Sequence, residues 1–511
     1  MITPLPNAQD AIPTQTVPFR IAIIGAGITG INLALGLQER GIPFTLYERA
    51  PAFGEIGAGI GFSPNAERAM AIISKKLILD AFRRTANPNG EDYFQWIDGW
   101  KTDELIFKLH VGKDGFQGCK RSEILEEWAK GLDPERVVFG KTVDLVVEKG
   151  DNDSGSGSDV EITFTDGTTA NADVVIGCDG IRSRIRQIIL SPYASPPSTS
   201  STTLSNSMSP PPPPPDFATP NTFLRPVGGR HNSCPPSVNS PPTSVSFLDL
   251  PPSAHPHYTS KYCFRALIPM AKALSALGEA RALTRFMYNG PNAHIITYPI
   301  GGNTVLNVLV VLTDKNPWPF PHKHTADAAK QEALDAFAGW HPTARKIVDL
   351  FPDDQKMDKW AIFDMAAYPA PHFHKGKVCV AGDAAHATGP HLGAGGGLGI
   401  EDALVLSELL KAVYSKLSDQ ENGEEQRKRK GKLVEAALDS YNEVRYERTQ
   451  KVVQLTRNAV DLFQWRDGNE AGVDAERFGG RITKCFHTVW DYDVERMVHD
   501  AVAGLEGRAM V

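Results

Sequence analysis

The sequence predicts an α/β fold in which a domain with a parallel sheet is interleaved with a mixed-sheet domain and followed by a helical C-terminal region. Three observations predict this fold. A short apolar strand runs into a glycine-rich turn and a helix at 21–40. A second strand, glycine-rich turn and long helix follow at 377–410. Between them, the β-branched stretches 261–270 and 294–313 are typical of strands in a sheet with one covered face.

The composition narrows the class of protein. The 511 residues are 41% hydrophobic and 22% charged, which is typical of a globular chain with a large core. The net charge of −7 gives no basic excess, so no nucleic-acid partner is expected. No apolar run approaches the roughly 18 residues of a membrane helix, and no secretory signal is visible. The six cysteines form no CxxC pair, and no histidines stand at metal-ligand spacing, so we expect a cytoplasmic protein without a metal.

The first β-α-β unit carries a G-x-G-x-x-G motif made by Gly25, Gly27 and Gly30. In this context the first glycine makes the tight turn, the second lets a pyrophosphate approach, and the third lets helix and strand pack closely. The helix N-terminus then offers free N–H groups to the phosphates. Glu48 ends the next strand, where an acid that binds a ribose diol is expected. An acid there predicts FAD or NAD(H) rather than NADP(H).

A second candidate site follows the later strand. Asp383 ends that strand, where its carboxylate is suited to bind a ribityl or ribose hydroxyl. The glycines of 393–399 let backbone N–H groups approach a flat ring or an anion. A nicotinamide enzyme has no need of a second site so far along the chain, whereas a long cofactor with a ribityl chain does. The pattern therefore favours FAD. No second G-x-G-x-x-G stands between a strand and a helix, so a separate NAD(P)H domain is not expected.

Three motifs occur in a characteristic order: GAGITG at 25–30, CDGIRSRIR at 178–186 and AGDAAHATGPHLGAGGGLGIEDA at 381–403. With them the sequence resembles the FAD-dependent aromatic hydroxylases, the single-component (group A) flavoprotein monooxygenases. The resemblance covers about 20–190 and about 260–500. The passages YNEVRYERTQKV and VWDYDVE are similar to the C-terminal part of the salicylate hydroxylase-like branch, which is common in fungi.

The resemblance implies a domain organisation. A Rossmann-like, GR2-type FAD-binding domain is expected over 19–190 and 360–415, a substrate-binding sheet domain over 259–359, and a helical region over 416–511. The stretch 191–258 is rich in Pro and Ser and cannot bury enough apolar surface to order itself. FAD motifs lie on both sides of it, so we interpret it as a disordered insertion. An inert insertion is favoured over a proline-recognition ligand, and an unspliced stretch stays open.

The resemblance also implies roles for residues at the cofactor. The first glycine loop would hold the FAD pyrophosphate, Glu48 the adenosine ribose and Asp383 the ribityl region. Arg121 would reach the FAD chain, and Asp179 would touch both FAD and the nicotinamide path. Backbone N–H groups after Pro390 would lie over the isoalloxazine ring and stabilise negative charge on the reduced flavin. The cofactor-binding residues are then Gly25, Gly27, Gly30, Glu48, Gly61, Arg121, Asp179, Asp383, Pro390, Gly393, Gly395, Gly396 and Gly397.

Five further polar residues lie inside these motifs. For the three arginines, surface or structural pairing is favoured over catalysis. For the two histidines of the cofactor loop, a structural role is favoured over acid–base work. These residues are Arg182, Arg184, Arg186, His386 and His391.

The family chemistry is NAD(P)H- and O₂-dependent hydroxylation of a phenol through a C4a-hydroperoxyflavin. Arg265 interrupts an apolar strand, and an arginine is rarely buried without an anion. Arg265 and Tyr298 resemble a catalytic pair in fungal polyketide-modifying relatives, which implies that they clamp a phenolate; the alternative is a salt bridge for Arg265 and core packing for Tyr298. The pair favours a polyketide-type phenol of secondary metabolism, hydroxylated or dearomatised. Alternatives are decarboxylative hydroxylation of a salicylate-like hydroxybenzoate, a flavin oxidase or dehydrogenase, and a non-catalytic flavin-binding homologue.

Overall fold

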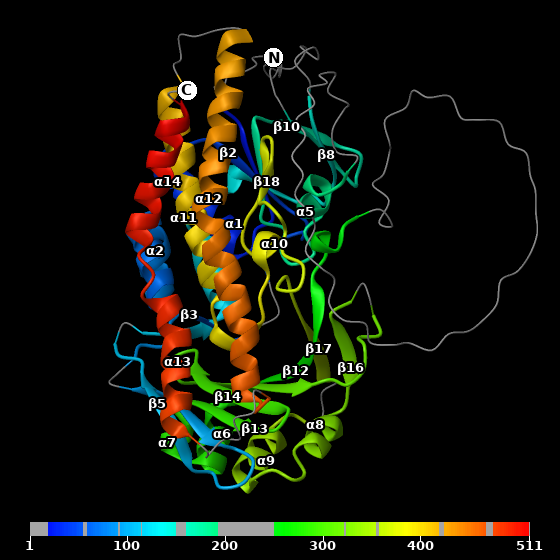
Figure 1. Ribbon diagram of the computed structural model, residues 1–511, viewed down its shortest axis with the longest axis vertical. Helices are drawn as coiled ribbons and strands as arrows, with labels where there is room; N and C mark the ends of the chain where they lie inside the picture. The colour runs from blue at the N-terminus through cyan, green and yellow to red at the C-terminus, as the bar shows by residue number, and fades with distance from the viewer. Residues whose placement is uncertain are drawn as a thin grey trace, which may run out of the picture.

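The computed structural model has two large sheets placed one above the other along the long axis, with long C-terminal helices beside both (Figure 1). The upper sheet belongs to the predicted FAD-binding domain and the lower sheet to the predicted substrate domain. Most of the predicted insertion at 191–258 lies outside the described residues. The structure describes residues 19–54, 59–89, 92–113, 115–149, 160–192, 250–320, 323–353, 357–417, 424–466 and 474–509.

The upper sheet has six strands in the order β18-β19-β11-β1-β2-β7. Strand β1 pairs in parallel with β2 and β11, and β11 pairs in parallel with β19. All four residues of β1 are buried, as expected where both faces of a parallel sheet are covered. Because the carboxyl ends of parallel strands lie at one edge, the turns after β1, β11 and β19 meet there. The strands are β1 (Ile21–Ile24), β2 (Phe44–Glu48), β7 (Val137–Phe139), β11 (Val174–Gly177), β18 (His374–Lys375) and β19 (Val378–Val380).

Helices and two small sheets surround the upper sheet. Helix α1 follows the first glycine turn and packs against α11. The small sheets are β10-β9-β8 and the pair β3-β6. The bounds are α1 (Ile28–Glu39), α2 (Pro64–Ser74), the π-helical η1 (Lys75–Leu79), α3 (Asp80–Thr85), α4 (Arg121–Ala129), η2 (Pro134–Arg136), α5 (Arg184–Ile189), α10 (Asp383–His386), η5 (Pro390–Leu392), β3 (Gly59–Phe62), β6 (Gln117–Lys120), β8 (Val143–Glu148), β9 (Val160–Phe164) and β10 (Thr169–Ala172).

The lower sheet has eight strands in the order β16-β17-β12-β15-β14-β13-β4-β5. Strands β4 and β5 come from the segment 19–190, and β17 runs past the expected boundary at 359, so the domains interleave more finely than predicted. The physical reason is pairing with distant strands: β4 joins β13 in parallel, and β17 joins β12. The strands are β4 (Tyr93–Asp98), β5 (Leu105–His110), β12 (His257–Pro269), β13 (Arg285–Gly290), β14 (Ala293–Ile300), β15 (Val305–Thr313), β16 (Thr325–Ala328) and β17 (Met357–Asp364).

The two faces of the lower sheet are covered differently. The face turned away from the upper sheet packs against α6 to α9 and includes Phe264 and Tyr288. The opposite face includes Ile296 and Tyr298 and packs against η5, which carries Leu392, and against α12 and α13. A site between the two domains therefore uses this second face. The covering helices are α6 (Met270–Leu277), α7 (Glu279–Ala282), α8 (Lys330–Ala336) and α9 (Pro342–Asp349), and the short η4 (Pro252–Ala254) precedes β12.

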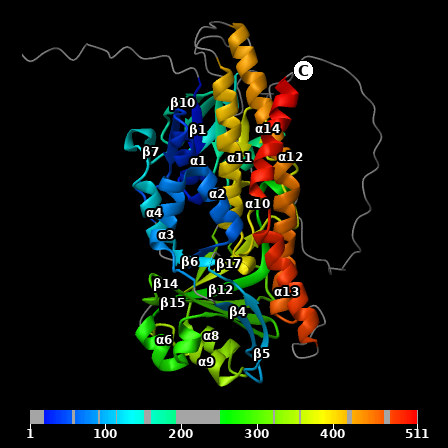
Figure 2. The same ribbon diagram turned by 90° about the vertical axis from the view of Figure 1, so that its left-hand side faces the viewer.

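Four helices make up the C-terminal part of the chain, and the first of them already begins at Gly395. Helix α12 runs beside both sheets (Figure 2). Its Lys430 Nζ lies 2.7 Å from Asp173 Oδ1 at the upper sheet, and its Arg457 lies 2.6 Å from Asp364 at the end of β17. Within the described ranges, no helix is both long and apolar enough to cross a membrane. The helices are α11 (Gly395–Lys416), α12 (Glu424–Phe463), α13 (Ala475–Trp490) and α14 (Val494–Ala509).

The described chain resumes at Leu250, before the predicted end of the insertion at 258. Ala254 is fully buried, and its carbonyl accepts a hydrogen bond of 3.2 Å from Arg186 Nε. Strand β12 then begins at His257. Packing therefore starts earlier than composition indicates, because a distant arginine holds this short segment against α5.

Candidate active site

The turns after β1, β11 and β19 touch one another at the edge of the upper sheet. Gly25 has a φ of 101°, which favours glycine, and a Cβ there would lie 2.5 Å from the carbonyl oxygen of Cys178. The Cys178 N–H donates to the Ile24 carbonyl at 2.7 Å. A Cβ on Gly382 would lie 2.2 Å from Thr29 Oγ1 on α1. The three sequence motifs therefore form one site.

The first glycine loop has the shape that a pyrophosphate needs. A Cβ on Gly30 would lie 1.9 Å from the Gly25 carbonyl oxygen, so this position must stay bare for strand and helix to pack. A Cβ on Gly27 would meet nothing within 4 Å. No side chain caps α1 at Gly27, and no acid stands in its first turn. The free N–H groups and the space at Gly27 fit the phosphates of FAD.

Glu48 lies beside this loop at the end of β2. Its carboxylate accepts hydrogen bonds from the N–H of Ala26 at 2.7 Å and from the N–H of Ala50 at 2.8 Å. Each carboxylate oxygen has two lone pairs, so Glu48 retains capacity for ribose hydroxyls. Ribose binding by Glu48 stays a prediction, as does the role of Arg121, which begins α4 where β6 ends.

The two aspartates of the later motifs differ in what their carboxylates bind. Asp179 accepts hydrogen bonds from Ser183 Oγ at 2.6 Å and from the N–H groups of Arg184 and Ile185, so it caps α5. Burial raises the pKa of Asp179, although these hydrogen bonds act to lower it. Asp383, by contrast, is exposed at the start of α10. Its exposed carboxylate is open to a ligand, and the ribityl contact stays a prediction, whereas the carboxylate of Asp179 is engaged by its own helix.

The predicted ring loop faces strand β3. Pro390 begins η5, and α11 starts directly after it with no side-chain cap and no acid in its first turn. The Phe116 ring lies between the two backbones: a Cβ on Gly61 would lie 1.9 Å from its Cζ, and one on Gly393 would lie 2.6 Å from its Cε2. The sequence analysis did not single out Phe116. The loop also contains Gly395, Gly396 and Gly397, which open α11.

Arg265 is exposed rather than buried, so the expectation of a buried arginine is wrong. It stands on an alternating strand, β12, and its guanidinium lies 3.8 Å from the centre of the Trp360 ring. Among the described residues it makes neither a hydrogen bond nor an ion pair. Desolvation lowers the pKa of Arg265, and the charge of Arg121 lowers it further. The salt bridge that was the alternative to a clamp is not present in the described structure.

Tyr298 lies on the same face of the lower sheet as Arg265. Burial raises the pKa of Tyr298, and the nearby cation of Arg265 opposes the shift. Two buried histidines, His294 on β14 and His391 in the ring loop, have their ring centres 5.6 Å apart. Burial lowers the pKa of His294, and it lowers the pKa of His391 to about 3, so both rings are neutral.

The other polar residues of the motifs are mostly structural. Arg184 Nε donates to the Asp144 carbonyl at 2.9 Å, and Arg182 Nε lies 3.2 Å from His324 Nε2. Arg186 is fully buried, which the sequence alone did not indicate. His386 Nε2 lies 2.6 Å from an Asp402 carboxylate oxygen. Asp402 is also buried, and the sequence alone did not indicate a role for it. No local pattern in RSRIR distinguishes the one arginine that faces inward, because Arg184 and Arg186 lie on the short helix α5 and have the same residue type.

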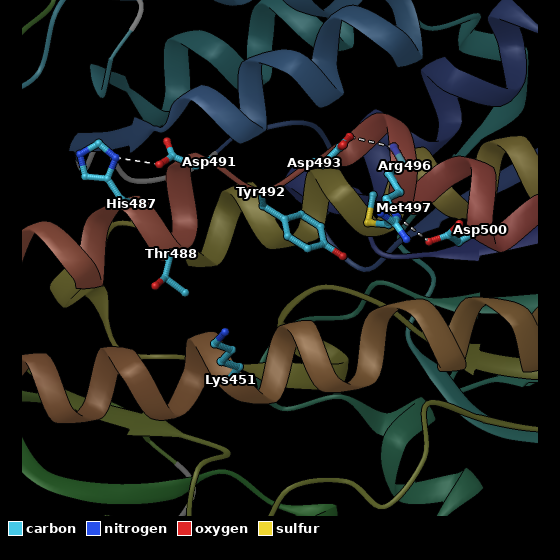
Figure 3. A pocket seen from close by; sticks show the side chains of 9 residues that line it. All are labelled: Lys451, His487, Thr488, Asp491, Tyr492, Asp493, Arg496, Met497 and Asp500. Carbon is cyan, nitrogen blue, oxygen red and sulfur yellow. Dashed lines mark hydrogen bonds and ion pairs between the residues drawn. The ribbon is translucent and has the colours of Figure 1, made fainter.

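A separate pocket of about 440 Å³ lies among α12, α13 and α14 (Figure 3). Its acids already have partners: Asp491 lies 2.8 Å from His487, Asp493 accepts the Arg496 N–H, and Asp500 lies 3.5 Å from Arg496. None of the predicted site residues lines it. The residues that do are Lys451, His487, Thr488, Asp491, Tyr492, Asp493, Arg496, Met497 and Asp500.

The parallel sheet and the uncapped glycine turn after β1 are typical of an α/β oxidoreductase that binds a dinucleotide cofactor. The FAD binding domain family matches residues 19–224 and 318–456. The chain is 40% identical over 503 residues to the FAD-dependent monooxygenase orf3 of Aspergillus niger, which covers 97% of this chain and 98% of that protein. It therefore belongs to the FAD-dependent aromatic hydroxylase family and is an FAD-dependent monooxygenase.

Two further comparisons agree. The salicylate hydroxylase asL1 of Sarocladium schorii is 33% identical over 504 residues, covering 96% of this chain and 91% of that protein. A solved salicylate hydroxylase substrate complex superposes with a TM-score of 0.69 at 23% identity, covering 95% of this chain and 98% of that one. At that identity the superposition shows the fold alone.

Proposed function

We propose that this monooxygenase uses NAD(P)H and O₂ to hydroxylate or oxidatively dearomatise a phenol of polyketide type, and that Arg265 and Tyr298 bind the phenolate. Bound FAD supplies the redox chemistry that links the nicotinamide, O₂ and the arene. The observation that carries the proposal is Arg265, a cation without an ion pair among the described residues on the face that turns toward the ring loop.

The sheet register separates Arg265 and Tyr298 by a distance that suits one aromatic ring between them. Arg265 pairs with Leu309, and Leu309 pairs with Ile296, which is two residues from Tyr298 on the same strand. Two strand spacings and two residues along the strand separate their Cα atoms by about 12 Å. This span accommodates one aromatic ring between the two side-chain ends. Both side chains point to one face because directly paired residues, and residues two apart, share a face.

The electrostatics favour an anionic substrate. The guanidinium of Arg265 is partly desolvated and meets the charge of Arg121, which makes a phenolate oxygen a favourable partner. Tyr298 offers a hydroxyl donor to the same oxygen. A phenolate is more electron-rich than a phenol, so holding the proton off the oxygen favours attack at the ortho carbon. The residues thus bind, orient and electrostatically prepare the ring.

Part of the surrounding surface is apolar. Leu309 and Ile296 line the sheet face, and Phe116 and Leu392 belong to the same buried cluster. Such walls exclude water, which strengthens charge interactions at the oxygen. An aromatic substrate with one anionic oxygen matches this set better than a substrate with several charges.

The test compares two arginines of the same domain. Arg265→Met removes the proposed phenolate partner, whereas Arg345→Met removes an exposed cation from α9 on the far face of the sheet. A charged hydrogen bond contributes about 1.5–3 kcal/mol, so kcat/KM for a phenol is expected to fall roughly 10- to 150-fold in the first variant only. Bound FAD, measured by visible absorbance, should be equal in both. Unchanged turnover in Arg265→Met with FAD retained would contradict the proposal.

The product identifies the substrate class. A panel of resorcinol-type phenols and hydroxybenzoates is incubated with NADH or NADPH, and products are identified by mass spectrometry. Gain of one oxygen on the phenols supports the proposal. Gain of one oxygen with loss of carbon dioxide, found only for hydroxybenzoates, would replace it with the salicylate-type reaction. Stoichiometric hydrogen peroxide without any oxygenated product would point to an oxidase.

A further inference from the structure

The turn α10 carries Asp383 but is too short to fix its own geometry. It consists of four residues, Asp383–His386, between β19 and the ring loop. A single helical turn gains too few hydrogen bonds to offset the entropy of ordering it. No side chain caps its N-terminus. The direction of the exposed Asp383 carboxylate therefore depends on what holds this turn from outside.

Arg186 holds the carbonyl side of the turn. Its Nη1 donates to the Ala384 carbonyl at 2.7 Å and to the Asp383 carbonyl at 3.4 Å. Its Nη2 donates to the Ile181 carbonyl at 2.6 Å, within the second motif. The side chain is fully buried, and these partners are all backbone carbonyls. Helix carbonyls without partners are costly to bury, and this guanidinium satisfies those of α10.

Asp402 holds the amide side of the same turn. This residue of α11 is fully buried, and its Oδ2 accepts the Gly382 N–H at 2.7 Å and lies 2.6 Å from His386 Nε2. Its Oδ1 accepts the Arg445 Nε–H at 2.7 Å, from α12. Burial would raise the pKa of Asp402, but His386 and Arg445 outweigh it and hold the carboxyl ionised. A charged acceptor thus fixes both ends of α10.

We propose that Arg186 and Asp402 are positioning residues for FAD: from opposite sides they clamp α10, so that the Asp383 carboxylate is presented to the cofactor chain. The clamp also connects the cofactor turn to α12 through Arg445. This inference rests on the proposed role of Asp383. Two buried charges are a costly way to pack a turn, since apolar residues of similar volume stabilise a core as well or better. Their directional hydrogen bonds are what an oriented ligand requires.

The chain supplies a matched control for Asp402. Asp173 is also a buried aspartate; it accepts the Arg20 N–H at 2.6 Å and lies 2.7 Å from Lys430 of α12. It stands before β11, at the opposite edge of the sheet from the glycine turns. Asp402→Asn and Asp173→Asn therefore each weaken one buried tie between α12 and the same domain, and only the first touches α10.

The readouts are thermal unfolding of the FAD-free protein and the FAD dissociation constant, measured by quenching of flavin fluorescence. Both variants should lower the unfolding temperature. Only Asp402→Asn should raise the dissociation constant, by about 10- to 100-fold, and shift the flavin absorbance bands, with turnover regained at saturating FAD. Equal FAD affinity in the two variants would overturn the clamp.

A second pair keeps the test decisive if Asp402→Asn does not fold. Arg186→Lys retains the charge but cannot reach all four carbonyls, whereas Arg184→Lys alters a neighbour on α5 whose Nε donates to the Asp144 carbonyl of β8. Only Arg186→Lys should weaken FAD binding. Asp383→Asn is measured in parallel: if it binds FAD normally, the proposed role of Asp383 fails. If Asp383→Asn is weak while the Asp402 and Arg186 variants bind normally, the clamp alone fails.

Discussion

Replacing Gly27 with alanine adds a single methyl group that should weaken FAD binding without lowering the stability of the fold. Gly27 has φ −76° and ψ −171°, a backbone conformation that alanine adopts without strain. The added Cβ meets nothing within 4 Å, so the fold should tolerate it. At such compatible positions a glycine-to-alanine change stabilises a protein by about 0.4–1 kcal/mol, because the unfolded chain loses freedom.

Binding of FAD should respond in the opposite direction. If this loop binds the pyrophosphate as we propose, the new methyl group occupies space that the phosphates need at the N-terminus of α1. One hydrogen bond to a charged group contributes about 1.5–3 kcal/mol, so losing a single phosphate contact weakens FAD binding roughly 10- to 150-fold. Gly30→Ala is the contrast, since its Cβ would lie 1.9 Å from the Gly25 carbonyl oxygen and must disturb the packing itself.

The assay pairs differential scanning calorimetry of the FAD-free variants with isothermal titration of FAD. Gly27→Ala should unfold at or slightly above the wild-type temperature and bind FAD weakly. Gly30→Ala should unfold several degrees lower. Wild-type FAD affinity in Gly27→Ala, or a loss of stability in it as large as that of Gly30→Ala, would refute the assignment of this loop.

Three further predictions follow from burial. Because the pKa of His391 is about 3, its ring stays neutral in the folded chain, whereas in the unfolded chain it is protonated below about pH 6.5. The free energy of unfolding should therefore fall about 2 kcal/mol more from about pH 7 to pH 5 in wild type than in His391→Gln. Parallel pH profiles of the two proteins in urea unfolding would contradict this. Replacing 193–249 with a short Gly-Ser loop should leave FAD bound, whereas extending the deletion through Ala254 should release it, as absorbance at the flavin bands will show. Arg445→Met removes the cation that two buried carboxylates share, those of Glu401 and Asp402. It should cost about 3–5 kcal/mol in chemical denaturation, and a cost below 1 kcal/mol would contradict this.

Local signals in the sequence predicted the cofactor half of the site. A buried strand, Gly25 to Gly30 and a helix follow one another directly, and the physics of that turn needs no distant partner. The turn that carries Asp383 was predictable for the same reason, although β19 ends at Val380 and Asp383 begins α10 rather than ending the strand. The fold class followed from these two units and from the alternating strands between them.

The burial of single side chains and the division between the two sheets depend on contacts between distant residues, which local sequence patterns do not predict. Arg186 is buried because carbonyls from three separate segments meet around it, and its place in the sequence shows only that it follows two other arginines. Strands β4 and β5 look like part of the first domain until β4 pairs with β13. Arg265 was predicted to be buried because its strand is apolar, but the neighbouring Trp360 ring gives it a partner while leaving it exposed.

Helix α12 sets a limit on how the enzyme can move. Its 40 residues correspond to a helix about 60 Å long. Ion pairs connect it to the upper sheet through Lys430, to α11 through Arg445 and to the lower sheet through Arg457. Because one helix contacts both sheets, the sheets cannot separate without breaking these ion pairs. We therefore expect access of a reductant and release of a product to depend on movement of the cofactor or of short loops rather than on separation of the two sheets.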